Sequence, residues 1–186
     1  MRNRSAKLTF LIFILTFIAW AALVYYFGSE QIVEMVGVEN GYLITFLIAL
    51  FGGMSSFTGS TYVATLITFA NGGLDPLLLA LCATAGVSIG DTVYFILARR
   101  GSLLLTRRST LKKKIDQLRA WLEQKSAWLI WISVYLYTAL TPLPNDVLTI
   151  ALGLTRQPYL LVITALTAGA FTLSYVIMQF GQLLPF

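Results

Sequence analysis

Long apolar runs, interrupted by small or proline-rich polar stretches, are the feature that most restricts how this chain can fold. Apolar residues make up 58% of its 186 residues and charged residues only 11%, with a mean hydropathy of +0.79. A typical soluble domain carries about 25% charged residues. The chain is therefore expected to be an all-α integral membrane protein, because a helix satisfies its own backbone hydrogen bonds in lipid.

The first apolar run, Leu8 to Phe27, is about 20 residues long, which is enough for a helix to cross the hydrocarbon core. Basic residues precede it, as they precede the apolar region of a signal peptide. The run ends in bulky aromatic residues rather than small ones, which indicates a retained helix. Residues 1–40 are predicted to form an N-terminal transmembrane helix and an external acidic segment.

The distribution of charge predicts the topology of the first half. Nine of the thirteen lysines and arginines lie between Arg99 and Lys125, and the positive-inside rule places this block in the cytoplasm with the basic N-terminus. An even number of crossings must separate the two. The first helix and a second span at 77–98 supply two crossings. Residues 41–70, broken by GGMSSFTGST, are therefore predicted to be a re-entrant hairpin that opens outward.

The second half follows a similar plan. Residues 103–126 carry leucine and isoleucine at helical spacing with lysines on other faces, which indicates a cytoplasmic amphipathic helix at the membrane surface. A solvated basic loop that only fixes the topology is the alternative. Residues 127–155 are broken by TPLPND, where Pro142 and Pro144 end a helix inside the membrane, so a second hairpin is predicted to open inward. Residues 159–180 form the last span, which leaves the C-terminus outside.

The two hairpin-plus-span units align with each other at an offset of about 83 positions. At this offset Thr84-Ala85-Gly86 meets Thr167-Ala168-Gly169. Such matches are common in apolar sequence, but the charge argument independently starts the two units on opposite sides. An inverted repeat with helices broken at mid-membrane is the architecture of many secondary transporters.

Polar residues at membrane depth are the candidate transport residues. Asp91 lies about 12 Å from the cytoplasmic end of its helix, where a carboxylate marks either a functional site or a structural cap or ion pair. Asn145 and Asp146 follow the proline break and either cap a half-helix or contact a headgroup. Ser60 and Thr61 offer hydroxyl groups from the first hairpin, although small polar residues also serve helix packing.

Arg99, Arg100 and Arg156 lie where the cytoplasmic entrance of a transport route between the two hairpins is expected. They either attract an anionic headgroup or only fix the topology at helix ends. The candidate substrate-binding residues are therefore Ser60, Thr61, Asp91, Arg99, Pro142, Pro144, Asn145, Asp146 and Arg156.

Familiar enzyme signatures are missing from the sequence. The chain has no histidine, no Walker loop, no GxSxG motif and none of the usual metal-ligand spacings. Its single cysteine, Cys82, excludes an intrachain disulfide. No enzymatic activity, catalytic residue, metal, cofactor or nucleic-acid partner is expected.

Two segments of the sequence resemble a known family. GVSIGDTVYFILARRG is similar to the glycine-aspartate, aromatic, arginine motif of the DedA superfamily, also called the VTT-domain or SNARE-associated superfamily. TPLPNDVLTIALGLTR resembles its second-hairpin motif, and residues 41–181 correspond to the whole VTT-like domain. The resemblance implies two facing re-entrant hairpins and movement of lipids, namely undecaprenyl phosphate in bacterial members and phospholipids in eukaryotic relatives.

The chain departs from the family pattern at two places. Many bacterial members carry an acid in the first hairpin, where this chain has Thr58-Gly59-Ser60-Thr61, and an arginine before the second-hairpin proline, where it has Tyr137-Thr138-Ala139. Those charges are associated with proton-coupled, phosphate-selective transport. Because this chain lacks both charges, the resemblance does not decide whether transport is coupled to protons or whether undecaprenyl phosphate is the substrate. The expected fold is unchanged.

Three functions follow from these patterns as hypotheses. The first is a lipid transporter, a flippase or scramblase of the plasma or inner membrane, whose partners are membrane lipids with an anionic headgroup. The second is an ion-coupled transporter of a small solute that uses Asp91 and Asp146 as cation or proton sites. The third is a membrane assembly protein without transport activity, and a homodimer is open in each case.

Overall fold

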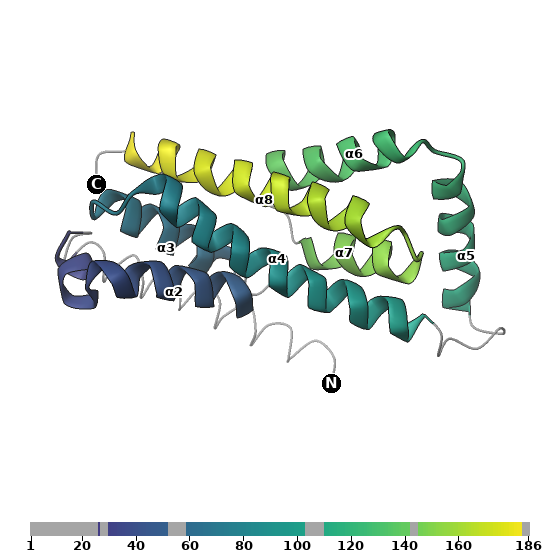
Figure 1. Cartoon of the computed structure of the whole chain (residues 1–186), viewed down its shortest axis with the longest axis horizontal. Helices are drawn as coiled ribbons and strands as arrows, with labels where there is room; N and C mark the ends of the chain where they lie inside the picture. Colours follow the sequence, from purple (N-terminus) through teal and green to yellow (C-terminus); the bar gives the residue numbers. More distant parts are fainter. Residues whose placement is uncertain (1–25, 27–29, 52–58, 103–109, 142–144, 184–186) are drawn as a thin grey trace.

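The computed structural model describes residues 26, 30–51, 59–102, 110–141 and 145–183, and all secondary structure within these ranges is helical (Figure 1). The predicted span at 8–27 lies outside the described residues, apart from Tyr26. After a short helix, Glu30–Val36, seven longer helices follow. They are α2 (Val38–Phe51), α3 (Gly59–Asn71), α4 (Pro76–Gly101), α5 (Thr110–Glu123), α6 (Ala127–Leu140), α7 (Asn145–Leu154) and α8 (Tyr159–Gln182).

Helices α4 and α8 form the centre of the molecule. They contain 26 and 24 residues, so at about 1.5 Å per residue both are long enough to cross a membrane. A third span is counted if Glu30–Val36 and α2 are taken as one segment, although these helices meet at an angle of 93°. The two central helices run in opposite directions, and a hydrogen bond of 2.8 Å joins Ser88 Oγ and Thr167 Oγ1 between them.

The ends of several helices follow from local sequence. Asp75 caps α4, because its Oδ1 accepts hydrogen bonds from the amides of Leu77 (2.8 Å) and Leu78 (2.9 Å), and Pro76 stands where a missing amide hydrogen costs least. Ser126 caps α6 in the same way, at 3.3 Å from the Leu129 amide. The predicted span boundaries at 77–98 and 159–180 lie close to those of α4 and α8.

Two pairs of short helices pack against the central helices from opposite ends (Figure 1). The α2–α3 pair lies at the end where the C-terminus is found, and the α6–α7 pair lies at the other end. Helix α2 packs on α4 and α3 on α8, whereas α6 packs on α8 and α7 on α4. These four helices contain 10 to 14 residues, so each reaches at most about 21 Å along its axis.

Two glycines allow the closest helix contacts. A Cβ atom on Gly86 of α4 would lie 2.4 Å from the Phe46 carbonyl oxygen of α2. A Cβ atom on Gly169 of α8 would lie 2.6 Å from Thr138 Cβ and 3.0 Å from the Tyr135 carbonyl oxygen, both on α6. Each central helix therefore meets the first helix of one short pair at a glycine.

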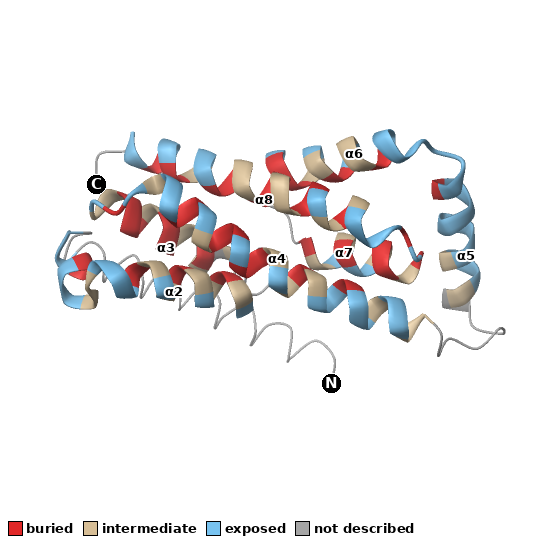
Figure 2. Ribbon diagram, in the orientation of Figure 1, coloured by how far each residue is buried: buried red, intermediate tan, exposed pale blue. Residues whose placement is uncertain are grey.

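Apolar side chains are found both inside and outside the helix assembly. One buried cluster joins α2, α3, α4 and α8, and a second joins α4, α6, α7 and α8 with Leu122 of α5. Large apolar residues are also exposed along the outer faces of long and short helices alike (Figure 2), for example Leu97 of α4, Leu140 of α6 and Leu160 of α8. Such a surface suits lipid better than water, in agreement with the expected membrane protein.

Helix α5 runs across the long axis of the molecule at the α6–α7 end (Figure 1). Leu122 is buried, whereas Leu118 and Trp121 are exposed on a helix that also carries three lysines and one arginine. An ion pair of 2.8 Å joins Arg119 Nε and Glu123 Oε1 on its surface. The first residues of the amphipathic helix predicted at 103–126 lie outside the described part of the chain.

Candidate functional site

Asp91 is buried between α4 and α7, with 5% of its surface exposed. Thr149 of α7 donates a hydrogen bond from Oγ1 to Asp91 Oδ1 at 3.3 Å. The second carboxylate oxygen, Oδ2, has no hydrogen-bond partner among the described residues. A buried carboxylate is costly in lipid, so Asp91 and the residues around it are the candidate functional site.

Asn145 lies on the same face of α7 as Thr149. It is the first residue of that helix, one helical turn before Thr149, and only 1% of its surface is exposed. Within the described ranges, neither Oδ1 nor Nδ2 of its side-chain amide makes a hydrogen bond. The α4–α7 interface therefore holds a carboxylate oxygen and a complete amide group whose hydrogen-bonding capacity is unused.

The position of α7 against α4 is fixed one turn beyond Thr149. A Cβ atom on Gly153 would lie 2.7 Å from the Phe95 carbonyl oxygen and 2.9 Å from Ala98 Cβ. The contacts Thr149–Asp91 and Gly153–Phe95 have the same spacing in sequence, so the two helices run parallel in register. By this register Asn145 lies beside the turn of α4 that precedes Asp91.

Asp146 is the next residue of α7 and is half-buried. Because α7 begins at Asn145, Asp146 stands in the first turn rather than at the N-cap position. A carboxylate in the first turn is favourable there, since it complements the positive end of the helix dipole.

A second buried polar contact lies between α3 and α8. Tyr62 Oη and Ser174 Oγ are 2.6 Å apart, and Ser174 Oγ also lies 2.6 Å from the Ala170 carbonyl oxygen. Since the serine hydroxyl hydrogen is donated to that carbonyl, the tyrosine donates to the serine. Neither residue is among the candidates predicted from the sequence. The one available signal was the 83-position offset, at which Tyr62 corresponds to Asn145 and Ser174 to Asp91.

Arg156, the second residue after the end of α7, adopts a left-handed backbone conformation with φ of 59°. Its amide and that of Gln157 bond back to the carbonyls of Gly153 and Leu152, which is the usual way for glycine to end a helix. Gly73 ends α3 in the same way with φ of 90°, and it lies 83 positions earlier. An arginine there costs about 1 kcal/mol more than a glycine.

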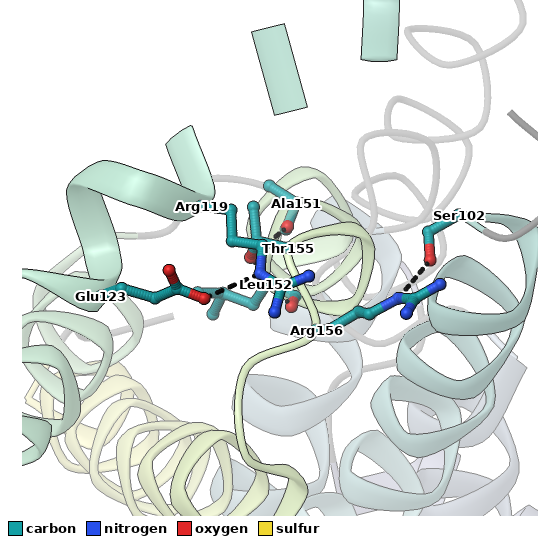
Figure 3. A network of polar contacts seen from close by, with 7 residues as sticks. All are labelled: Ser102, Arg119, Glu123, Ala151, Leu152, Thr155 and Arg156. Carbon is teal, nitrogen blue, oxygen red and sulfur yellow. Dashed lines mark hydrogen bonds and ion pairs between the residues drawn. The ribbon is translucent and has the colours of Figure 1, made fainter. Parts of the chain in front are cut away.

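The side chain of Arg156 joins α7 to the end of α4. Its Nε donates to Ser102 Oγ at 3.1 Å (Figure 3). Arg99 Nη1 donates to the Gln157 carbonyl oxygen at 3.4 Å, across the same junction. The two predicted arginines are therefore brought to one end of the molecule, the end that α5 crosses.

The remaining predicted residues are placed only in part. Thr61 lies half-buried in the first turn of α3, and its carbonyl accepts a hydrogen bond of 2.8 Å from Thr65 Oγ1. Ser60 belongs to α3, but its side chain, like Pro142 and Pro144, lies outside the described part of the structure. Asp91 and Arg99 are eight residues apart on α4, about 12 Å along the axis, so one small group cannot contact both directly.

Within the described ranges, no group of three or more cysteine, aspartate or glutamate side chains is arranged to hold a metal ion. Comparisons of the chain with protein-family models, with curated proteins and with solved structures give no match. The resemblance to the DedA superfamily therefore rests on the two sequence motifs.

Proposed function

We propose that this chain moves lipids between the two leaflets of a cell membrane, as a flippase or scramblase resembling the DedA, or VTT-domain, superfamily. The observation that carries the proposal is a row of buried polar side chains, Asp91, Asn145 and Thr149, inside a largely apolar helix assembly. The row lies beside the point where α6 ends and α7 begins. Asp91 and Asn145 have hydrogen-bonding atoms to offer there, whereas the outer faces of the same helices are apolar. A headgroup would pass along this row while its acyl chains stay in lipid.

The α2–α3 and α6–α7 pairs are, in this proposal, two re-entrant hairpins. Their helices are too short to cross about 30 Å of hydrocarbon. Both ends of each pair lie at one end of the molecule, and the two pairs enter from opposite ends (Figure 1). Each pair would thus leave the membrane on the side where it entered.

An inverted repeat would explain which short helix packs on which central helix. The first helix of each pair packs on the central helix that follows it, and the second packs on the central helix of the other unit. Gly86 and Gly169, one offset of 83 positions apart, both make close contacts with the first helix of a pair, α2 and α6. This is the relation expected of a transporter built from two units in opposite orientation.

The charges support an orientation with the α5 end in the cytoplasm. Glu30, Glu34, Glu39 and Asp75 belong to the elements at the α2–α3 end, whereas Arg99, Arg156 and the lysines of α5 belong to the other end. The stacked rings of Trp128, Trp131 and Tyr135, with centroids 5.7 and 5.5 Å apart, begin near the same end, as in an aromatic belt. Helix α5 would lie along the surface of an anionic leaflet.

An anionic headgroup would first meet Arg99 and Arg156 at the cytoplasmic mouth. The N-terminus of α7, deeper in the molecule, offers a positive dipole end to a phosphate group. The second candidate, an ion-coupled transporter of a small solute, is favoured by the unsatisfied oxygen of Asp91.

Purified protein in liposomes is expected to speed the exchange of a fluorescent headgroup-labelled lipid between leaflets without hydrolysing it. Dithionite quenches only the outer leaflet, so active protein raises the quenched fraction from about half to nearly all of the signal. Protein-free liposomes are the control. A quenched fraction that stays at the control value would contradict the proposal, and release of inorganic phosphate from a lipid phosphate would point to an enzyme instead.

A further inference from the structure

Two buried polar pairs occupy corresponding places in the two halves of the chain, but only one of them is closed. Tyr62 and Ser174 are joined by a hydrogen bond of 2.6 Å. Their counterparts at the 83-position offset are Asn145 and Asp91. In that second pair Asp91 Oδ2 and both polar atoms of the Asn145 amide lack a partner among the described residues.

Side-chain length accounts for part of this difference. By the register of the Thr149–Asp91 and Gly153–Phe95 contacts, Asn145 lies one turn away from the level of Asp91. The long Tyr62 side chain reaches Ser174, whereas the shorter Asn145 side chain makes no hydrogen bond within the described residues. Thr149, which stands level with Asp91, occupies only Oδ1.

Two of the three atoms that lack a hydrogen-bond partner among the described residues at the α4–α7 interface, Asp91 Oδ2 and Asn145 Oδ1, are acceptors, and the first belongs to a carboxylate. Asp91 has no ion-pair partner among the described residues, and its counterpart in the other half is a neutral serine. A buried carboxylate and amide without hydrogen-bond partners are unfavourable in a low-dielectric interior, because nothing compensates for the lost contacts with water. A bound positive group with a demand for oxygen ligands would remove that cost.

We propose that Asp91 and Asn145 form a binding site for one small monovalent cation. A single carboxylate balances a single positive charge, and the carboxylate, amide and hydroxyl oxygens of Asp91, Asn145 and Thr149 are the ligands that hard cations and ammonium groups accept. Both side chains are more than nine-tenths buried, so the site excludes a bulky quaternary ammonium group, which also lacks N–H donors. The cation is either a free alkali-metal ion or the protonated amine of a lipid headgroup.

The site is tested on the purified full chain by thermal unfolding in chloride salts of equal ionic strength. Sodium and potassium represent free ions, ethylammonium represents a headgroup amine, and tetramethylammonium is the reference. At saturation at least one small cation is expected to raise the melting temperature above the reference by about 5 °C. A rise with ethylammonium alone assigns the site to an amine headgroup, and a rise with sodium or potassium alone assigns it to a free ion.

Variants of the two pairs make the test specific. Asp91→Asn is expected to abolish the cation-dependent rise and Asn145→Leu to reduce it, whereas Tyr62→Phe, which opens the closed pair, keeps it. Equilibrium dialysis of the unmodified chain with radiolabelled sodium or ethylamine gives a second readout that needs no variant, with about one cation expected per chain.

The proposal is overturned if all salts give the same melting temperature and dialysis shows no bound cation, or if the rise persists in Asp91→Asn. The cation site does not depend on lipid transport. A cation-dependent rise in melting temperature in protein that exchanges no lipid would support the cation site and contradict the proposed function. Lipid exchange by protein whose melting temperature does not respond to cations would support the proposed function and contradict the cation site.

Discussion

Gly86→Ala is expected to lose most of its folded protein when it is produced in membranes. The new Cβ atom would lie 2.4 Å from the Phe46 carbonyl oxygen and 2.8 Å from the Leu50 amide nitrogen, and backbone atoms of α2 cannot move aside as a side chain can. Overpacking of this kind costs about 1–3 kcal/mol or more. For a chain of this size that lowers the melting temperature by about 2–4 °C per kcal/mol.

The control for this prediction lies on the same helix. Gly101→Ala adds the same methyl group to α4, where nothing in the described residues comes within 4 Å of it apart from its chain neighbours and its own helix, so no loss is expected. Gly41→Ala should be intermediate, because the atom closest to the new Cβ in the described part of the chain is a terminal methyl carbon of Leu74, at 2.7 Å, which can move aside. Folded yield and melting temperature are measured by fluorescence-detected size-exclusion chromatography. Equal values for Gly86→Ala and Gly101→Ala would show that α2 and α4 do not meet at this glycine.

Asp91→Asn and Asp146→Ala are expected to reduce lipid exchange per folded molecule by about tenfold or more. A hydrogen bond to a charged group is worth about 1.5–3 kcal/mol, and tenfold in rate corresponds to about 1.4 kcal/mol. For Asp91 stability should fall little, because removing a buried charge also removes its burial penalty. The half-buried Asp146 loses a favourable interaction with the helix dipole, worth about 0.3–1 kcal/mol. The measurement is the dithionite rate divided by the amount of folded protein, compared with the melting temperature in the same buffer.

A structural role for the two acids predicts the opposite pattern. A group that only stabilises a helix end contributes about 1 kcal/mol, so its loss lowers the melting temperature and leaves the rate per molecule unchanged. Tyr62→Phe is the matched control, since it removes a buried hydroxyl from the other half of the chain while Ser174 keeps its bond to the Ala170 carbonyl oxygen. A loss of exchange in Tyr62→Phe as large as in Asp91→Asn would argue against a special role for the acids.

The sequence predicts the helical fold well where apolar runs and charges act together. The spans at 77–98 and 159–180 differ from α4 and α8 by at most three residues at any end. Helix α4 is bounded by the Asp75 cap and by Arg99 and Arg100, and α8 begins directly after Pro158. The break after residue 140 was also predicted, since proline cannot continue a helix. These are local properties, and a membrane restricts the alternatives further.

The buried polar contacts could be predicted only in part. Asp91 and Asn145 stand out as polar residues in apolar sequence, but their common interface depends on the register between α4 and α7, which no local pattern fixes. Tyr62 and Ser174 look like ordinary helix residues because their hydrogen bond joins positions 112 residues apart. Likewise, the left-handed conformation of Arg156 could be suspected only from its alignment with Gly73.

The proposed lipid route requires that both ends of each short helix pair lie on the same side of the membrane. Single cysteines are introduced into Cys82→Ser protein at Glu39, in the first turn of α2, and Leu77, in the first turn of α4 after the α2–α3 pair. Two more are introduced at Gln124 and Pro158, which flank the α6–α7 pair. Intact cells are treated with an impermeant thiol reagent. Cysteines 39 and 77 are expected to react from outside, and cysteines 124 and 158 only after permeabilisation. If positions 39 and 77 are labelled from opposite sides, the α2–α3 pair crosses the membrane and the account is contradicted.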